Sequence, residues 1–201
     1  PPALFRRAPA VGESYTHSYV GTQSGPLLPI TVTINYQETI RREADERTEW
    51  VVEPIIKRPE DMALVRDYLP VPKLAPAPVE AAYQELGQDG ILRGFVFGDQ
   101  GGPWQHACQL VGTQEMIMAT YDDPAWVHEL LRSLTDKKLR YVDESLRGLP
   151  FDLIEMGGGA ASSTVISPTL FREFCLPYDR EIHQLLHDVG HRVVYHTCGG
   201  M

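Results

Sequence analysis

The residues best suited to chemistry lie in the stretch RVVYHTCGG (192–200), where His196 and Cys198 stand two positions apart. Side chains at positions i and i+2 of a strand leave on the same face, so a strand here presents both groups together. Imidazole and thiolate form a ligand mixture that suits zinc. A catalytic zinc needs three protein ligands, however, and Cys108 and Cys175 fall in predicted helices. For the isolated pattern, a buried cysteine beside a hydrogen-bonded histidine is the commoner explanation.

Two other predicted strands also end in glycine-rich segments, FGDQGGPW (97–104) and IEMGGGAASS (154–163). Glycines allow a ligand to approach the backbone, although in any single loop they more often only close a tight turn. The carboxyl ends of parallel strands gather functional groups at one edge of a sheet or barrel. The residues at these ends are therefore our site candidates, together with His196 and Cys198: Asp99, Gln100, Trp104, Glu155, Gly158, Gly159 and Ser162.

The elements that must position these residues alternate along the second half of the chain. Ser167 and Asp123 are predicted helix caps, and Pro177 is expected to kink or split its helix. The expected strands are 91–99, 151–156 and 192–198, and the expected helices begin at Pro103 and cover 122–148 and 168–189. This order predicts right-handed βαβ units and a parallel sheet. From the pattern alone, a (β/α)8 barrel and an open doubly wound sheet both remain open.

The first half is less regular. Residues 1–25 are expected to be a loop or an extended arm, and 26–37 and 46–56 resemble two strands of an antiparallel hairpin. Helices are expected over 58–69 and at the end of 71–90. We predict one domain over 1–201, with an irregular, hairpin and helical part (1–90) and a βα part (91–201).

Composition narrows the class of protein. The 201 residues carry a formal net charge of −9, which argues against a nucleic-acid partner. We therefore interpret Trp104 and Trp126 as packing anchors rather than as platforms on which bases stack. No apolar run approaches the roughly 20 residues that span a bilayer. Three cysteines do not form a disulfide framework, so we expect a cytoplasmic protein.

Other catalytic motifs are incomplete. HQLLH (183–187) lacks the glutamate of a metalloprotease helix, and GGGAASS (157–163) lacks the lysine of a phosphate-binding loop. No serine-hydrolase elbow and no dinucleotide fingerprint is present in the sequence.

Three segments together resemble the uroporphyrinogen decarboxylase superfamily: GPWQHACQLVG, the helix DDPAWVHELLRSLTD, and ISPTLFREFCLPYDREIHQLLHDVGHRVVYHTCGG. The resemblance covers about residues 91–201. It implies a (β/α)8 barrel with its site in the barrel mouth and a full chain of well over 300 residues. We therefore expect a partial TIM barrel that lacks its closing strands, and an exposed sheet edge that favours aggregation or oligomerisation.

The resemblance implies two chemistries. Methyltransferases of the superfamily bind zinc through H-x-C and a later cysteine, which matches His196 and Cys198 and places the third ligand beyond residue 201. Glu155 is then a further ligand or a general base, and Asp99 and Gln100 line the substrate pocket. The implied partners are a thiol and a corrinoid such as methylcobalamin, free or on a corrinoid protein.

The decarboxylase branch instead acts on a tetrapyrrole in porphyrin biosynthesis, without metal or cofactor. Its N-terminal signature M-R-Q-A-G-R-Y is absent here, and GGGAASSTV replaces its D-S-W-A-G. A zinc-dependent methyltransferase is therefore our leading hypothesis. The alternatives are a decarboxylase and a non-catalytic barrel that binds a corrinoid or tetrapyrrole. A homo-oligomer is compatible with each of them.

Overall fold

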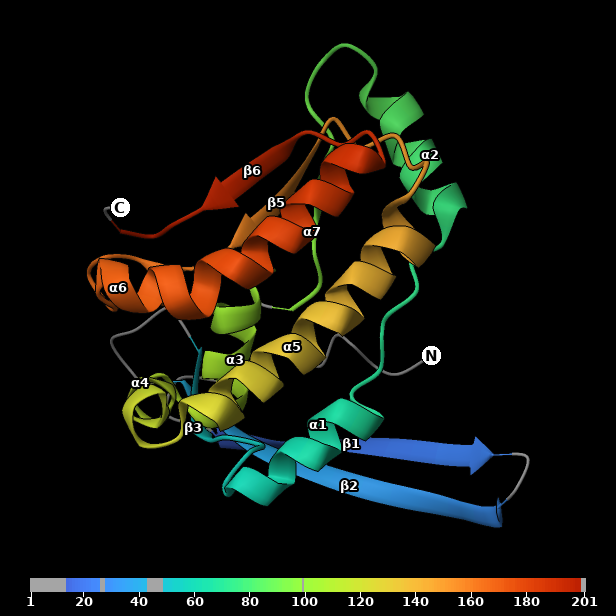
Figure 1. Ribbon diagram of the computed structural model, residues 1–201. Coiled ribbons are helices and arrows are strands. Elements are labelled where there is room, and N and C mark those ends of the chain that lie inside the picture. The colour runs from blue at the N-terminus through green and yellow to red at the C-terminus, as the bar shows by residue number, and fades with distance from the viewer. Residues whose placement is uncertain (1–13, 26–27, 43–48, 99, 200–201) are drawn as a thin grey trace. The chain divides into compact units, whose positions relative to one another are not determined.

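The chain divides into two units, Pro1–Tyr68 and Leu69–Met201, which are described separately. The structure is a computed structural model, and it describes residues 14–25, 28–42, 49–98 and 100–199 (Figure 1). None of the described helices is both long enough and apolar enough to cross a membrane.

The first unit contains an antiparallel sheet of order β1-β2-β3. Its strands are β1 (Ser14–Gly25), β2 (Leu28–Arg42) and β3 (Glu49–Glu53). Residues 14–25, expected as a loop or extended arm, thus form a strand that pairs along β2. A 3-10 turn, η1 (Pro59–Asp61), and the helix α1 (Met62–Tyr68) follow, within the helix expected over 58–69.

The second unit is an α/β arrangement around a small parallel sheet of order β4-β5-β6. Its strands are β4 (Arg93–Phe95), β5 (Leu153–Gly157) and β6 (Val193–His196). Its helices are α2 (Pro76–Leu86), α3 (Pro103–Val111), α4 (Thr113–Asp122), α5 (Pro124–Tyr141), α6 (Pro168–Leu170) and α7 (Leu176–Asp188). The short turns are η2 (Val142–Leu146), η3 (Gly159–Ala161) and η4 (Phe171–Cys175).

The two long helices begin where the sequence predicts. Asp123 accepts a hydrogen bond from the Trp126 amide at 3.1 Å, and Pro124 occupies the first position of α5. Ser167 likewise accepts from the Leu170 amide at 3.2 Å at the start of α6. The interruption expected near Pro177 is the π-helical turn η4, which directly precedes α7. The helix α4 was not foreseen; Gly112, with a φ of +108°, separates it from α3.

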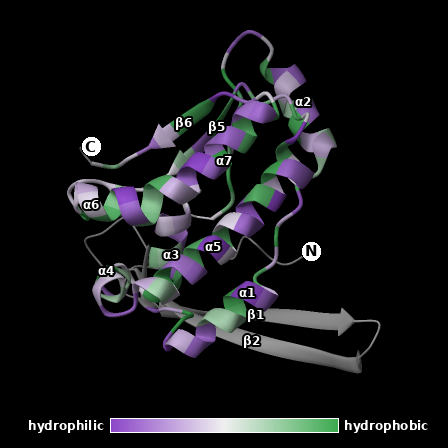
Figure 2. Cartoon of the chain, viewed as in Figure 1, coloured by the Kyte–Doolittle hydropathy of each residue, from purple (hydrophilic) through white to green (hydrophobic). Residues whose placement is uncertain are grey.

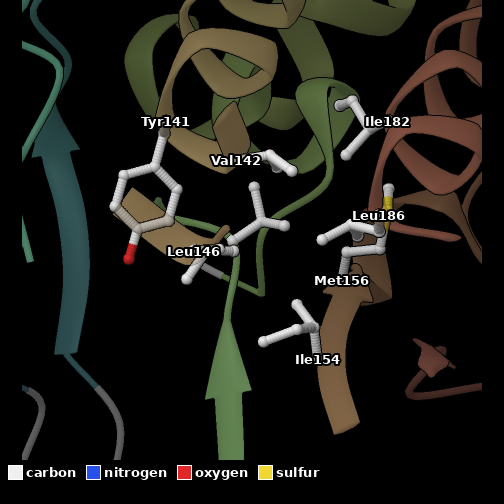
Figure 3. Packing of buried hydrophobic residues seen from close by; sticks show 8 residues of the cluster. Tyr141, Val142, Leu146, Ile154, Met156, Ile182 and Leu186 are labelled. Carbon is white, nitrogen blue, oxygen red and sulfur yellow. The ribbon is translucent and has the colours of Figure 1, made fainter. Parts of the chain in front are cut away.

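The core of this unit lies between the sheet and the helices. Hydrophilic and hydrophobic residues alternate along α5 and α7 (Figure 2). Tyr141 of α5 and Ile182 and Leu186 of α7 pack in one cluster with residues of β5. Figure 3 shows the packing of these side chains. The fully or nearly buried cluster consists of Val96, Tyr141, Val142, Leu146, Ile154, Met156, Ile182 and Leu186.

The opposite face of the sheet is open in the described part of the chain. Phe95 on β4 is 45% exposed and Val194 on β6 is 42% exposed, although both belong to strands. Because side chains alternate along a strand, this face also receives Arg93, Glu155 and His196. The open face therefore carries the charged residues of the three strands.

Candidate functional site

The three parallel strands bring their carboxyl ends to one edge. Glu155 pairs in register with Phe95 on one side and Val194 on the other, and Gly157 pairs with His196. Three of the predicted site residues from distant parts of the sequence thereby meet: Gln100, Glu155 and His196. Together with Arg93 and Cys198, they form what we call the strand-end site.

Glu155 is the buried charge of this site. Its side chain is only 6% exposed, and one carboxylate oxygen accepts a hydrogen bond from Arg93 Nη1 at 2.6 Å. The other oxygen lies 3.0 Å from His196 Nδ1. Both oxygens therefore have partners, as a buried carboxylate requires. Sequence reasoning missed Arg93, whose only signal was a basic residue within a short buried strand.

The imidazole of His196 lies between a carboxylate and a thiol. Nδ1 faces Glu155, and Nε2 lies 3.0 Å from Cys198 Sγ. A carboxylate only accepts hydrogen bonds, so the proton of the neutral ring belongs on Nδ1 and the lone pair of Nε2 points toward the sulfur. This is the orientation in which a histidine offers Nε2 to a metal while a carboxylate fixes its tautomer.

Gln100 completes the surroundings of Cys198. Its Oε1 accepts a hydrogen bond from the Gly159 amide at 2.7 Å, which leaves Nε2 at 3.6 Å from Sγ of Cys198. Its φ of +50° is unusual for a residue with a side chain, and this backbone conformation aims it at the β5 loop. Gly159 belongs to the same contact, because a Cβ there would lie 3.1 Å from the Cys198 sulfur.

A close backbone approach explains Gly157. Its φ is +121°, and a Cβ at this position would lie 2.4 Å from the carbonyl oxygen of His196. The Gly157 carbonyl accepts from the Gly102 amide at 2.7 Å, while the Gly158 amide donates to the His196 carbonyl at 2.9 Å. The glycines therefore allow the three strand ends to hydrogen-bond to one another, rather than only closing turns.

The remaining predicted residues support the loop that follows β5. Trp104 is 2% exposed and its Nε1 donates to the Ala160 carbonyl at 3.0 Å. Ser162 is 1% exposed and its hydroxyl is bonded to that of Thr164 at 2.7 Å. A Cβ on Gly158 would lie 2.4 Å from the Gln105 side chain. Asp99 lies outside the described residues.

The donor atoms fit part of a zinc site. His196 Nε2 and Cys198 Sγ converge, and an imidazole nitrogen and a thiolate are common zinc ligands. Within the described ranges, no group of three or more His, Cys, Asp or Glu side chains is arranged to hold a metal. Glu155 lies on the Nδ1 side of the ring, away from the converging His196 Nε2 and Cys198 Sγ. Cys108 and Cys175 are buried, and burial raises the pKa of the Cys108 thiol to about 12.

Comparison with known proteins points to one family. The family model described as Uroporphyrinogen decarboxylase (URO-D) matches residues 42–201. Proteins named Uroporphyrinogen decarboxylase from Xanthomonas campestris pv. campestris strains B100 and 8004 are 29% identical over 99 residues, which are 45% of this chain and 27% of each relative. The chain thus spans about a quarter of the length of these relatives.

A solved structure shares the fold. A methyltransferase from Methanosarcina mazei superposes with a TM-score of 0.55 at 20% sequence identity, over 80% of this chain and 46% of that protein. At this identity the likeness concerns the fold alone. It relates the α/β arrangement of this chain to about half of a methyltransferase.

Proposed function

The chain belongs to the uroporphyrinogen decarboxylase family, and we propose that it is part of a zinc-dependent methyltransferase that moves a methyl group between a corrinoid and a thiol. The observation that carries the proposal is the convergence of His196 Nε2 and Cys198 Sγ at 3.0 Å, with Nδ1 held by Glu155. The fold shared with a methyltransferase supports it. We further propose that β4, β5 and β6 are consecutive strands of a (β/α)8 barrel whose mouth contains the strand-end site.

Each residue of the strand-end site has a role in this proposal. His196 and Cys198 hold the metal, and Glu155 keeps the proton of His196 on Nδ1 so that Nε2 remains a ligand. Arg93 balances the charge of Glu155, and Gln100 donates a hydrogen bond toward the Cys198 sulfur. A bound zinc lowers the pKa of a thiol substrate and so supplies a thiolate nucleophile at neutral pH.

The site needs more than the described residues provide. A catalytic zinc has three protein ligands and one position for substrate, so we propose that a third ligand lies outside the described ranges. The open face beside the site, with Phe95 and Val194 exposed, is where we place the corrinoid. Asp99 and Gln100, on the loop after β4, are proposed to line the thiol pocket.

Zinc content and methyl transfer test the proposal directly. The full-length protein that contains this chain, purified without chelators, is expected to hold one zinc and to demethylate methylcobalamin when a small thiol is added. The change in corrinoid absorbance measures this reaction. His196→Ala and Cys198→Ser should remove both the metal and the activity. His187→Ala, an exposed histidine on α7, is the matched control and should change neither. Metal-free protein that demethylates methylcobalamin normally would overturn the proposal.

Sequence similarity favours a second candidate, because the matched relatives are named Uroporphyrinogen decarboxylase. In that case the protein decarboxylates a tetrapyrrole without a metal. Consumption of uroporphyrinogen that a chelator and His196→Ala leave unchanged would establish this alternative in place of the first.

A further inference from the structure

Four polar side chains, three of them buried, lie on the other side of the sheet, between the strands and the helices. Lys138 on α5 is fully buried, Asp179 on α7 is 5% exposed, and His106 on α3 is 7% exposed. The fourth is Tyr195 on β6, which is partly buried. We call these four residues the rear cluster, and each belongs to a different element.

Lys138 contacts the end of β4. Its Nζ donates a hydrogen bond to the Phe97 carbonyl at 2.5 Å and lies 4.6 Å from the centre of the Phe97 ring. The next residue, Gly98, has a φ of +89°, and a Cβ there would lie 3.0 Å from Nζ and 2.8 Å from His106 Nδ1. Lys138 thus bonds to the backbone from which the loop to Gln100 departs, and His106 lies beside Gly98, where a side chain would clash with it.

Asp179 contacts the end of β6. Its Oδ2 accepts a hydrogen bond from the Tyr195 hydroxyl at 2.6 Å. Tyr195 and His196 are consecutive residues of a strand, so their side chains leave on opposite faces. A fixed Tyr195 therefore limits how far β6 can rotate about its axis, and with it the direction of His196.

Lys138 and Asp179 are buried groups of opposite charge on α5 and α7, and each opposes the effect of burial on the pKa of the other. A buried pair of opposite charges is a poor source of stability, because apolar residues of similar volume usually serve as well or better. This pair is also imperfectly satisfied, since Asp179 Oδ1 has no hydrogen-bond partner among the described residues. The geometry offers another role, because one charge holds the end of β4 and the other holds the end of β6.

We propose that Lys138 and Asp179 are positioning residues, which set Gln100 through the Phe97 carbonyl and His196 through Tyr195 and so hold the strand-end site in register. The inference rests on the proposed function where it concerns metal binding. The part that concerns the arrangement of Cys198 and its neighbours does not depend on the proposed function. A purely structural pair would affect stability and leave that arrangement unchanged.

Paired variants test this inference without leaving a buried charge alone. Lys138→Met/Asp179→Asn removes both charges, and Tyr195→Phe removes only the hydroxyl that Asp179 accepts from. The matched control is Arg132→Met/Glu181→Gln, which removes an exposed ion pair with an N–O distance of 2.8 Å between the same two helices. Melting temperature reports the fold, and Co²⁺ titration reports the affinity and ligand field of the metal site.

The double variant is expected to fold but to bind Co²⁺ about tenfold more weakly, with a shifted absorption band, as for groups that orient metal ligands. Tyr195→Phe should change the band in the same direction, and the control should change nothing. Wild-type affinity and spectrum in both the double variant and Tyr195→Phe would overturn the inference.

A second measurement separates this inference from the proposed function. In metal-free protein, the rate of Cys198 alkylation by iodoacetamide reports the contacts of the sulfur with His196 and Gln100. We expect this rate to change at least threefold in the double variant and to stay constant in the control. If wild-type protein binds no metal but the rate changes, the proposed function fails and the positioning role stands. An unchanged rate would count against the positioning role.

Discussion

The strand-end site and the rear cluster lie on the two faces of the same strands, and consecutive residues of β6 belong to one and the other. His196 points to the open face, where its side chain is 35% exposed, and Tyr195 points to the helices. Each region contains a buried carboxylate. Glu155 has a partner on both oxygens, whereas Asp179 has one oxygen without a hydrogen bond among the described residues.

The strand-end site and the rear cluster differ in how burial changes the pKa values of their charged groups. Burial lowers the pKa of Lys138 to about 7, an effect that Asp179 opposes, and raises the pKa of Asp179 to about 6. Burial and the nearby Lys138 also lower the pKa of His106 well below its usual value. The strand-end site instead keeps its charges paired and leaves His196 Nε2 and the exposed Cys198 thiol directed at each other. The paired charges of Glu155 and Arg93 at the open face suit a binding site. The buried charges of Lys138 and Asp179 on the other face suit the positioning of the strands.

Thiol labelling should show the largest contrast between the open face and the interior. Cys198 is exposed, whereas Cys108 and Cys175 are buried and burial raises the pKa of both thiols. Buried cysteines react only after local opening, so we expect Cys198 to react with iodoacetamide on the order of 100-fold faster or more. Peptide mass spectrometry after timed labelling measures each rate. Equal rates for the three cysteines would contradict this division into an open face and an interior.

A pair of glycine substitutions should show how tightly the strand ends are packed. Gly148 and Gly157 both have positive φ, but an added Cβ meets nothing within 4 Å at Gly148 and the His196 backbone at Gly157. Gly148→Ala should cost about 1 kcal/mol of unfolding free energy through backbone strain alone. Gly157→Ala should cost about 3 kcal/mol or more, because the backbone must also move. Urea denaturation measures both, and equal losses would show that Gly157 only closes a turn.

Much of the fold was readable because its signals are local. Asp123 with Pro124 and Ser167 with Pro168 marked the starts of two helices, and the structure contains both caps. The strand β1 was missed, because its pairing with β2 depends on a partner strand rather than on a pattern within 1–25. The helix α4, which follows Gly112, was also missed, because its residues show no clear helical periodicity in the sequence.

The site was predictable only in part. Parallel strands bring their carboxyl ends together, so Glu155, Gln100 and His196 could be grouped from their places at the strand ends. The contact between Glu155 and His196 Nδ1 depends on register and rotamer, which sequence spacing does not give. Lys138 and Asp179 were missed for a related reason. On an amphipathic helix, a charged residue is expected to face solvent unless the fold supplies a partner.

The smallest expected effect is a pH dependence that belongs to the rear cluster. Between about pH 7 and 10.5 the unfolded chain keeps the Lys138 proton that the folded protein has lost, so stability rises with pH. Between about pH 4 and 6 the folded protein keeps the Asp179 proton that the unfolded chain has lost, so stability falls as pH rises. The two groups therefore destabilise the fold most between pH 6 and 7.

Comparison with wild type reports this dependence together with its effect on the groups that face the pair. Lys138 contributes to the lowered pKa of His106, and Asp179 contributes to the raised pKa of Tyr195 and of Cys175, so the variant changes these groups as well. The quantity to measure is the difference in unfolding free energy between wild type and variant. Lys138→Met/Asp179→Asn should gain most, relative to wild type, between pH 6 and 7. The gain should shrink toward pH 4, where folding no longer requires a charged Asp179, and toward pH 10, where it no longer requires a charged Lys138. Arg132→Met/Glu181→Gln should show a flat difference between pH 6 and 9, because exposed pairs contribute little. A flat difference for the Lys138/Asp179 variant as well would mean that these charges are hydrated, and the contrast between the two faces of the sheet would then not be one of burial.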